Sequence, residues 1–305
     1  MTSVSFFIPA FNCAKTLAET VASIHDGNLQ DGDEIVIVND GSTDATAAVI
    51  RDLQSRYPSI RAIDHRFNKG GGAARNTAVE NAAHEILFCL DSDNILARAS
   101  IPRLRQFLLG TSADVAAFRQ PWYFVESVSQ VTHKWTYKLS QIELADYLAG
   151  AVVPGASGNY MFTRGSWLAA KRYPEFAGAL DTWGFGLRQV ATGQKMLVMP
   201  ESHYFHRYGH ESYWVRESKR TSISLTATQL LIPFFDQLLE QDVDYILGRS
   251  GRYGWFDRLD ERPLRLKSGQ RGVAGIRGDT SEEARSPRGL AQRLRRAMMR
   301  VMRYR

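Results

Sequence analysis

The sequence predicts an α/β protein with a mostly parallel sheet of the Rossmann type, flanked by helices. Short apolar segments alternate with segments of helical periodicity in the first part of the chain, which is the pattern of βαβ units. One apolar segment, residues 34–39, has no polar side chain in its middle and is therefore expected to be buried on both faces. Polar residues directly follow several of these segments. Ligands of such sheets bind at the carboxyl ends of the strands, so these polar residues mark the expected site.

The amino-terminal half is expected to contain four strands joined by helices. The predicted strands are residues 3–8, 34–39, 60–65 and 85–90. Leu17, Val21 and Ile24 recur at helical spacing after the first strand, and a second helix ends before Pro58. A third helix, residues 73–83, follows a glycine-rich turn at residues 70–72.

The remainder of the chain has shorter elements and less regular periodicity. The predicted strands are residues 114–119, 159–163 and 195–199, and the predicted helices are residues 185–191 and 213–239, the latter interrupted near Pro233. Residues 121–158 are rich in aromatic side chains and poorly periodic. We expect one domain over residues 1–248, divided near residue 118. A linker or mobile lid at residues 249–286 and a helical carboxyl-terminal extension at residues 287–305 follow it.

The net charge of +6 comes from the carboxyl-terminal tail. Residues 287–305 hold seven arginines and no acid, whereas the rest of the chain carries 31 basic and 32 acidic residues. This distribution argues against a folded face shaped for nucleic acid. On a helix, the tail would gather its apolar residues on one side and its arginines on the other, except for Met299 and Arg305, and this arrangement suits an anionic membrane surface. Docking of the tail on the protein's own domain is the alternative.

Two cysteines lie far apart, at Cys13 and Cys89, which favours a reducing compartment. The amino terminus has no basic region before an apolar segment, and no apolar run approaches about 18 residues. We therefore expect a cytoplasmic protein, with a peripheral position on the inner face of the membrane as the further expectation from the tail.

Two carboxylates one residue apart, Asp91 and Asp93, end the apolar segment 86–90. Residues at i and i+2 of a strand point the same way, roughly 6.5–7 Å apart. This spacing suits one carboxylate bound directly to a divalent cation and the other acting through water or on a sugar hydroxyl. The alternative is that one of the two acids caps a following helix.

Four segments resemble the family 2 glycosyltransferases with the GT-A fold, in their order and spacing. They are residues 7–12 (FIPAFN), 37–44 (IVNDGSTD), 68–76 (NKGGGAARN) and 90–93 (LDSD). The resemblance is strong over residues 3–118 and looser to about residue 209. It implies an inverting, metal-dependent hexosyltransferase that moves a single sugar from a nucleoside diphosphate sugar, with UDP as the expected nucleotide. The implied acceptor is a hydroxyl of a cell-envelope glycan or a lipid-linked acceptor. Residues 1–118 would form the nucleotide-sugar half and residues 119–248 the acceptor half.

The resemblance also implies roles for individual residues. The implied donor-binding set is Pro9, Ala10, Phe11, Asn12, Asp40, Gly70, Arg75, Asp91, Ser92 and Asp93. In this set Asp40 would hydrogen-bond the base, the Gly70 turn would admit the donor, and Arg75 would neutralise it. Mg²⁺ or Mn²⁺ would be held by Asp91 and Asp93, with His206 completing the site. A plain helix start for the glycines and a structural role for His206 are the alternatives.

Asp181 is the predicted general base. Residues 178–185 fall where the family shows a Glu-Asp pair before a helix with an arginine, here Arg188, but this chain has only one acid there. An inverting displacement needs one carboxylate opposite the leaving group, and the alternative is that Asp181 caps the helix. Four tryptophans could stack on sugars, with core packing as the alternative: Trp122, Trp135, Trp183 and Trp214.

Two other functions remain open from the sequence. A nucleotidyltransferase also uses acids on a parallel sheet, but it would need a basic glycine-rich loop after the first strand, and residues 9–12 are not one. A basic-tailed, non-catalytic adaptor that binds a nucleotide sugar is kept open by the single acid at Asp181.

Overall fold

The structure is a computed structural model that describes residues 2–209, 222–249 and 254–272. One large sheet organises it, with the strand order β3-β2-β1-β4-β9-β6-β10-β5. The strands of this path are β1 Val4–Ala10, β2 Glu34–Asn39, β3 Ile60–Asp64, β4 Ile86–Cys89, β5 Ile95–Leu96, β6 Val115–Phe124, β9 Tyr160–Thr163 and β10 Met196–Arg207. Two short strands, β7 His133–Lys134 and β8 Gln141–Ile142, pair with β6 and β10.

The first four strands are parallel, as the sequence predicts. Strand β1 pairs with β2 and β4, and β2 pairs with β3, all in parallel. Strand β9 then runs antiparallel to both of its neighbours, β4 and β6, and β10 is parallel to β6. The α/β, mostly parallel sheet of the prediction is confirmed, with β9 inserted between its two parallel parts.

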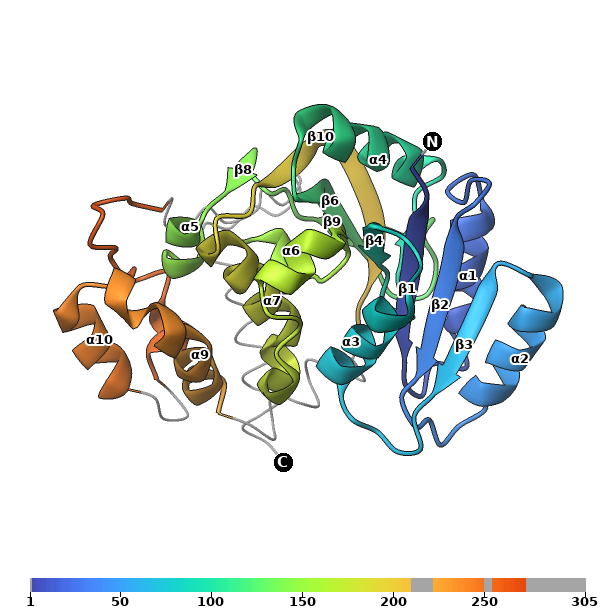
Figure 1. Cartoon of the computed structure of the whole chain (residues 1–305), viewed down its shortest axis with the longest axis horizontal. Coiled ribbons are helices and arrows are strands. Elements are labelled where there is room, and N and C mark those ends of the chain that lie inside the picture. The colour runs from blue at the N-terminus through green and yellow to red at the C-terminus, as the bar shows by residue number, and fades with distance from the viewer. Residues whose placement is uncertain (1, 210–221, 250–253, 273–305) are drawn as a thin grey trace.

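Helices cover both faces of the sheet (Figure 1). The α-helices are α1 Leu17–His25, α2 Thr46–Arg56, α3 Gly71–Asn81, α4 Ser100–Thr111, α5 Leu144–Leu148, α6 Arg164–Ala169, α7 Asp181–Ala191, α9 Ile223–Leu231 and α10 Glu240–Leu247. In Figure 1, α3 lies beside β1 and α1 lies behind β2, whereas α9 and α10 lie at the opposite end of the molecule. No helix in the described ranges is long and apolar enough to cross a lipid bilayer.

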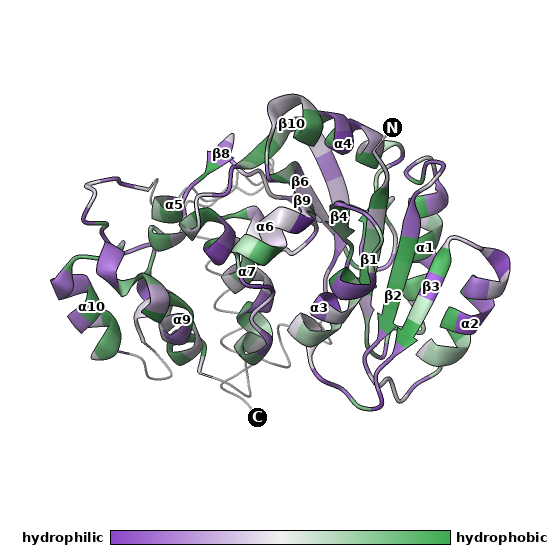
Figure 2. Cartoon of the chain, viewed as in Figure 1, coloured by the Kyte–Doolittle hydropathy of each residue, from purple (hydrophilic) through white to green (hydrophobic). Residues whose placement is uncertain are grey.

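Alternation along the central strands builds two separate cores. Phe7 of β1 and Val36 of β2 pack on the side of α3, whereas Phe6 and Ile35 pack on the side of α1. Successive side chains of a strand point to opposite faces, so an uninterrupted apolar strand fills both cores at once. Figure 2 shows β1 and β2 as largely hydrophobic segments.

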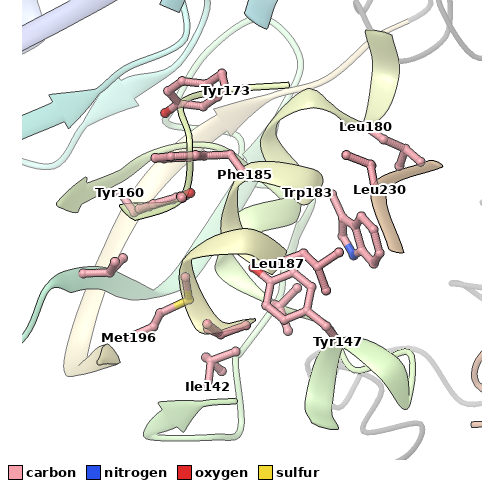
Figure 3. Packing of buried hydrophobic residues seen from close by; sticks show 14 of the residues in the cluster. Ile142, Tyr147, Tyr160, Tyr173, Leu180, Trp183, Phe185, Leu187, Met196 and Leu230 are labelled. Carbon is pink, nitrogen blue, oxygen red and sulfur yellow. The ribbon is translucent and has the colours of Figure 1, made fainter. Parts of the chain in front are cut away.

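The second half of the chain is held by an aromatic core around α7. Figure 3 shows Tyr160, Tyr173 and Phe185 lying close together beside this helix. The ring centroids of Tyr173 and Phe185 are 3.9 Å apart, and Phe162 meets Phe185 edge-on at 5.2 Å. Buried aromatic side chains carry a large apolar surface, so they supply the core of a region that the sequence shows as poorly periodic.

Residues 254–272 differ from the linker or lid expected at 249–286. Trp255 is 1% exposed and belongs to the same core as α7, and Leu266 forms a β-bridge with Leu238. This segment is therefore part of the folded domain. Residues 273–286 and the predicted tail helix at 287–305 lie outside the described residues.

The helix predicted over residues 213–239 is shorter in the structure. Helix α9 ends at Leu231, and a 3₁₀ turn, Ile232–Gln237, follows with Pro233 in its first turn. The interruption near Pro233 is confirmed, and residues 213–221 lie outside the described ranges.

Candidate functional site

The loops that follow β1 and β2 meet at one edge of the sheet. The side-chain oxygen of Asn12 accepts a hydrogen bond from the backbone N–H of Thr43 at 2.8 Å, and the Asn12 N–H donates to Ser42 Oγ at 3.0 Å. Asn12 has a φ of 50°, a left-handed conformation that asparagine tolerates better than most residues. The segment that contains Pro9, Ala10, Phe11 and Asn12 therefore ends beside the loop after Asp40. This is expected because the carboxyl ends of neighbouring parallel strands share one edge of the sheet.

Asp40 lies inside this edge rather than on it. Its side chain accepts hydrogen bonds from the N–H groups of Lys69 and Gly70, each at 2.9 Å, and lies 2.6 Å from Nδ1 of His65. Only 2% of the residue is exposed. Both carboxylate oxygens are thus engaged in holding the glycine turn, a different role from the predicted contact with a base.

The glycine turn joins this edge to helix α3. Gly70 has a φ of 95°, and a Cβ there would meet nothing within 4 Å, so the backbone conformation rather than space requires glycine. A Cβ on Gly72 would lie 3.2 Å from Cα of Glu175. Helix α3 therefore approaches closely the 3₁₀ turn Glu175–Leu180 that leads into Asp181.

Arg75 on α3 connects the two acidic positions predicted from the sequence. Its guanidinium donates to Asp91 Oδ1 at 2.8 Å and to Asp181 Oδ2 at 2.7 Å, and its side chain is 7% exposed. These positions are far apart in the chain but meet at one guanidinium. The guanidinium of Arg75 is thus already paired with two carboxylates, and its predicted role of neutralising a donor stays a prediction.

Asp181 is the first residue of α7, and the residue at the N-cap position is Leu180. Its Oδ1 accepts the N–H of Thr182 at 2.7 Å, and only 2% of Asp181 is exposed. Burial raises the pKa of the Asp181 carboxyl, and the Arg75 guanidinium opposes that rise. The capping alternative is therefore not what the structure shows, because the side chain is committed to Arg75 and to its own neighbour.

Asp91 is oriented by Asn159, a residue that the sequence did not single out. The Asn159 amide donates to Asp91 Oδ2 at 3.0 Å, while its oxygen accepts the N–H of Asp91 at 2.8 Å. Asn159 directly precedes β9, the antiparallel neighbour of β4. Strand pairing that sequence periodicity does not reveal thus brings Asn159 to the site.

Asp93 and Ser92 lie in the loop after β4. Burial and the nearby Asp91 charge raise the pKa of Asp93 to about 7, against the opposing charge of Arg207. The Ser92 carbonyl accepts a hydrogen bond from Thr16 at 2.9 Å. A half-buried carboxylate beside another carboxylate is stabilised by a cation, so the setting of Asp93 fits a divalent metal ion.

His206 on β10 is held as a neutral imidazole. Burial lowers its pKa to about 4, although the Asp91 charge acts in the opposite direction. Its Nδ1 lies 3.2 Å from the Tyr204 hydroxyl and 3.5 Å from the side-chain nitrogen of Asn94. The neutral form is the one that ligates metals.

Within the described ranges, no cluster of three His, Cys, Asp or Glu side chains is arranged to hold a metal ion. The predicted set of Asp91, Asp93 and His206 therefore does not form a ready-made cage. Mg²⁺ bound with a nucleotide usually takes only one or two carboxylates, with phosphate oxygens and water completing its shell. The residues present fit that kind of site.

Three of the tryptophans considered for sugar stacking can be placed. Trp183 is 8% exposed and packs in the core. Trp122 is stacked on His203 at 3.8 Å, with the Lys134 ammonium 3.7 Å from its ring centroid. Trp135 is half-buried, 5.8 Å from the ring of Tyr123. Trp214 lies outside the described residues.

The segments that build this edge also carry the match to a known family. Residues 5–168, more than half of the chain, match glycosyl transferase family 2. The chain belongs to glycosyl transferase family 2. The matched range includes the loops after β1 and β2, the glycine turn with Arg75, and Asp91 with Asp93.

Several relatives in this family share the amino-terminal part of the chain. Chondroitin synthase of Escherichia coli is 39% identical over 93 residues, which is 30% of this chain and 13% of that protein. Poly-beta-1,6-N-acetyl-D-glucosamine synthase of Staphylococcus epidermidis is 31% identical over 93 residues, or 30% of this chain and 22% of that protein. Poly(ribitol-phosphate) beta-glucosyltransferase of Bacillus spizizenii is 28% identical over 114 residues, or 37% and 18% of the two chains. The chain thus spans less than a quarter of each of these relatives.

Solved structures show the same GT-A fold. Staphylococcus aureus TarS in complex with UDP-GlcNAc aligns with a TM-score of 0.63 at 17% identity, covering 80% of this chain and 70% of that one. Mannosyltransferase PcManGT from Pyrobaculum calidifontis, in complex with GDP-Man and Mn²⁺, aligns with a TM-score of 0.55 at 17% identity, covering 76% and 64%.

Proposed function

We propose that this protein transfers one sugar from a nucleoside diphosphate sugar to an acceptor hydroxyl, with inversion at the transferred carbon. The observation that carries this proposal is the buried Arg75, which joins Asp91 at the end of β4 to Asp181 at the start of α7. An acid for the donor side and an acid for the acceptor side are needed within one site. The ion pairs of Arg75 bring Asp91, the candidate for the donor side, and Asp181, the candidate for the acceptor side, to one guanidinium.

In the proposed reaction Asp181 accepts the proton of the acceptor hydroxyl as that oxygen attacks the anomeric carbon. The new carbon–oxygen bond forms as the bond to the diphosphate breaks, and the nucleoside diphosphate leaves with the electron pair. A base on the face opposite the leaving group produces inversion. Arg75 favours the ionised form of Asp181 against the effect of burial, so that the carboxylate can take the proton.

The donor would lie over the loops after β1 and β2. Pro9, Ala10, Phe11 and Asn12 would border the base, and Gly70 would let backbone approach the donor, with Asp40 fixing that turn. Asp93, Asp91 and His206 would hold Mg²⁺ or Mn²⁺ with the diphosphate, and Ser92 would lie beside them. When bound, such an ion stabilises the negative charge that grows on the leaving nucleotide.

A UDP-sugar as donor and a cell-envelope glycan or lipid-linked acceptor are the finer parts of the proposal. The relatives are named for the synthesis of poly-beta-1,6-N-acetyl-D-glucosamine and for glucosyl transfer to poly(ribitol-phosphate), and one structural neighbour was solved with UDP-GlcNAc. Family membership disfavours a nucleotidyltransferase. A non-catalytic nucleotide-sugar-binding adaptor is the second candidate, because only one acid stands at Asp181.

A thermal-shift screen with UDP-, GDP- and dTDP-sugars, with and without Mn²⁺, tests donor binding, since a ligand of the native state raises its apparent stability. We expect a UDP-sugar to raise the midpoint only when Mn²⁺ or Mg²⁺ is present. Slow hydrolysis of the same donor, measured by release of UDP, then separates the enzyme from the adaptor. Binding without any release would favour the adaptor, and no binding would contradict the proposal.

A further inference from the structure

A second group of side chains borders the acids, and only one member of it, His206, has a part in the reaction described above. Strands β6, β7 and β10 present five half-buried rings on one face: Tyr123, His133, Trp135, His206 and Tyr208. We call this group the aromatic face. Tyr123 pairs across the ladder with both His133 and His206. Trp135 and Tyr208 lie two residues beyond His133 and His206, just past the ends of β7 and β10, where their N–H groups still donate to the β6 carbonyls of Pro121 and Phe124. This spacing places all five rings on the same side.

The rings of the aromatic face form a continuous surface. Tyr123 is stacked on His133 at 4.4 Å and lies 4.8 Å from His206, 5.8 Å from Trp135 and 6.1 Å from Tyr208. Tyr208 also meets His133 at 5.5 Å. Each ring is neither buried like a core residue nor fully exposed. An aromatic side chain with an apolar body and a polar tip suits a ligand that is itself part apolar and part hydroxylated.

A buried neighbour of the aromatic face, Tyr137, is linked to Asp91 by short contacts. Asn159 donates both to Asp91 and to the carbonyl of Ser157, at 3.0 and 2.6 Å, and Ser157 Oγ lies 3.3 Å from the Tyr137 hydroxyl. Tyr137 lies two residues beyond Trp135. The aromatic face thus lies near Asp91, the donor-side acid. It is formed at strands β6 and β10, which lie on the other side of β4 from β1 and β2 in the sheet.

Two cations of the same strands, Lys134 and Arg207, point to the opposite side of the sheet. The Lys134 ammonium lies 3.7 Å from the centroid of Trp122, and the Arg207 guanidinium lies 4.4 Å from that of Phe124. Arg207 also pairs with Glu19. Arg119 lies four residues before Tyr123 on β6 and therefore on the same side, but its guanidinium donates to the backbone carbonyls of Leu139 and Lys138, each at 3.1 Å. Because that charge is already hydrogen-bonded within the protein, the aromatic face is poorly suited to a phosphate-rich chain.

We propose that the aromatic face is the acceptor subsite and that it takes an uncharged pyranose ring, packed by its C–H face against Tyr208 and Tyr123. This inference rests on the proposed function and specifies its acceptor. It commits to a cyclic sugar acceptor and against an acyclic polyol phosphate. Tyr123, His133, Trp135 and Tyr208 are thereby assigned as binding residues, which position the acceptor hydroxyl without taking its proton.

Saturation-transfer NMR with methyl pyranosides of glucose, galactose, mannose and N-acetylglucosamine tests this directly. It needs no donor, and saturation is expected at the ring protons of at least one pyranoside, with little or none for ribitol or ribitol 5-phosphate. In Tyr208→Leu the affinity should fall about tenfold, or about 1.4 kcal/mol. The matched control is Phe205→Leu, on the same strand but the opposite face, which should leave the affinity unchanged.

Thermal unfolding of both variants checks that they fold, and Trp135→Phe supplies a second variant of the aromatic face. The inference is overturned if ribitol phosphate binds as well as the pyranosides, if no pyranoside binds, or if folded Tyr208→Leu and Trp135→Phe both bind as the wild type does. Donor binding, measured separately by thermal shift, keeps the two proposals apart. Donor binding without pyranoside binding would leave the proposed function standing and remove only this inference.

Discussion

At the scale of single residues, the arrangement of Arg75 between Asp91 and Asp181 decides most of the chemistry. Three charged side chains share one partly desolvated cluster, with two negative charges against one positive. Removing one partner of a buried ion pair leaves a charge without compensation. Substitutions here are therefore informative only when they keep shape and change charge, as an amide does for a carboxylate.

Asp181→Asn removes the proposed base and retains the volume of the side chain. Donor binding should survive, whereas turnover should fall about 10²–10⁴-fold, the usual contribution of a positioned general base. Steady-state release of nucleotide, with donor affinity measured in parallel by thermal shift, checks this. Asp52→Asn, at an exposed position on α2, serves as the control. Near-normal turnover in Asp181→Asn would mean that another group accepts the proton.

Asp93→Asn tests the metal assignment. The variant should lose the increase in donor affinity that Mn²⁺ confers, because an amide is a poor ligand for the ion compared with a carboxylate. Its stability without metal should equal or exceed that of the wild type, because burial already penalises the charged form of Asp93 and raises its pKa to about 7. Titrations of donor with and without Mn²⁺ decide the matter. Asp31→Ala, in an exposed loop, should leave both quantities unchanged.

At the scale of elements, one buried carboxylate ties the carboxyl-terminal segment to α10. Asp242 is 0% exposed, and it accepts hydrogen bonds from the Arg262 guanidinium and from both the backbone N–H and the side chain of Arg265. Leu264 and Leu266, on either side of Arg265, are buried in the core. The contact explains why residues 254–272 pack on the domain although their composition predicts a linker.

Asp242→Asn should lower the free energy of unfolding by about 2 kcal/mol at neutral pH, the range for hydrogen bonds to a charged group. Burial alone would raise the pKa of Asp242, but the hydrogen bonds and charges of Arg265 and Arg262 lower it below its usual value. A depressed carboxyl pKa stabilises the fold above the unfolded pKa of about 4, and this contribution is lost as pH falls through the folded pKa.

The difference between wild type and Asp242→Asn should therefore be largest above about pH 4, near the unfolded carboxyl pKa, and should shrink at lower pH. Urea unfolding across a pH series measures it. Asp244→Asn, on the exposed side of the same helix, is the matched control. A difference that stayed constant down to the lowest pH at which the protein folds would contradict the ion-pair explanation.

At the scale of the whole molecule, the folded domain extends further than the sequence indicates. We propose a single domain that reaches residue 272, in place of the boundary predicted at 248, because Trp255 and Leu266 share the core of α7. The basic segment 287–305 remains a prediction from the sequence alone, and a peripheral position on the inner face of a membrane depends on it.

The full chain should pellet with anionic vesicles at low salt and be released at high salt. Each arginine near such a surface contributes about 1 kcal/mol, and salt screens this attraction. A chain that ends at Ser286 should stay in the supernatant, and vesicles of neutral lipid should capture neither form. Co-sedimentation with quantified pellets measures the effect. If the full chain and the truncated chain partition alike, the tail is not a membrane anchor.

The sequence by itself determined the elements of the first half and predicted the candidate site residues that follow its strands. Strand β2 coincides with its predicted range, and the acids after β4 follow from an apolar run that ends abruptly. These features are local: hydrophobic periodicity reports burial of neighbouring residues in one element, and the carboxyl ends of parallel strands must share an edge.

Only the tertiary structure decided what those residues contact. Asp40 contacts His65 and the glycine turn, and Arg75 pairs with two acids. Asn159 orients Asp91 by hydrogen bonds. Each of these contacts joins segments distant in the chain, and no periodicity encodes such a contact. The same reason applies to residues 254–272, whose polar composition suggested a linker. Buried side chains such as Trp255 and the buried carboxylate of Asp242 hold this segment on the domain. The partners of these side chains come from distant parts of the chain, so composition alone does not predict the contact.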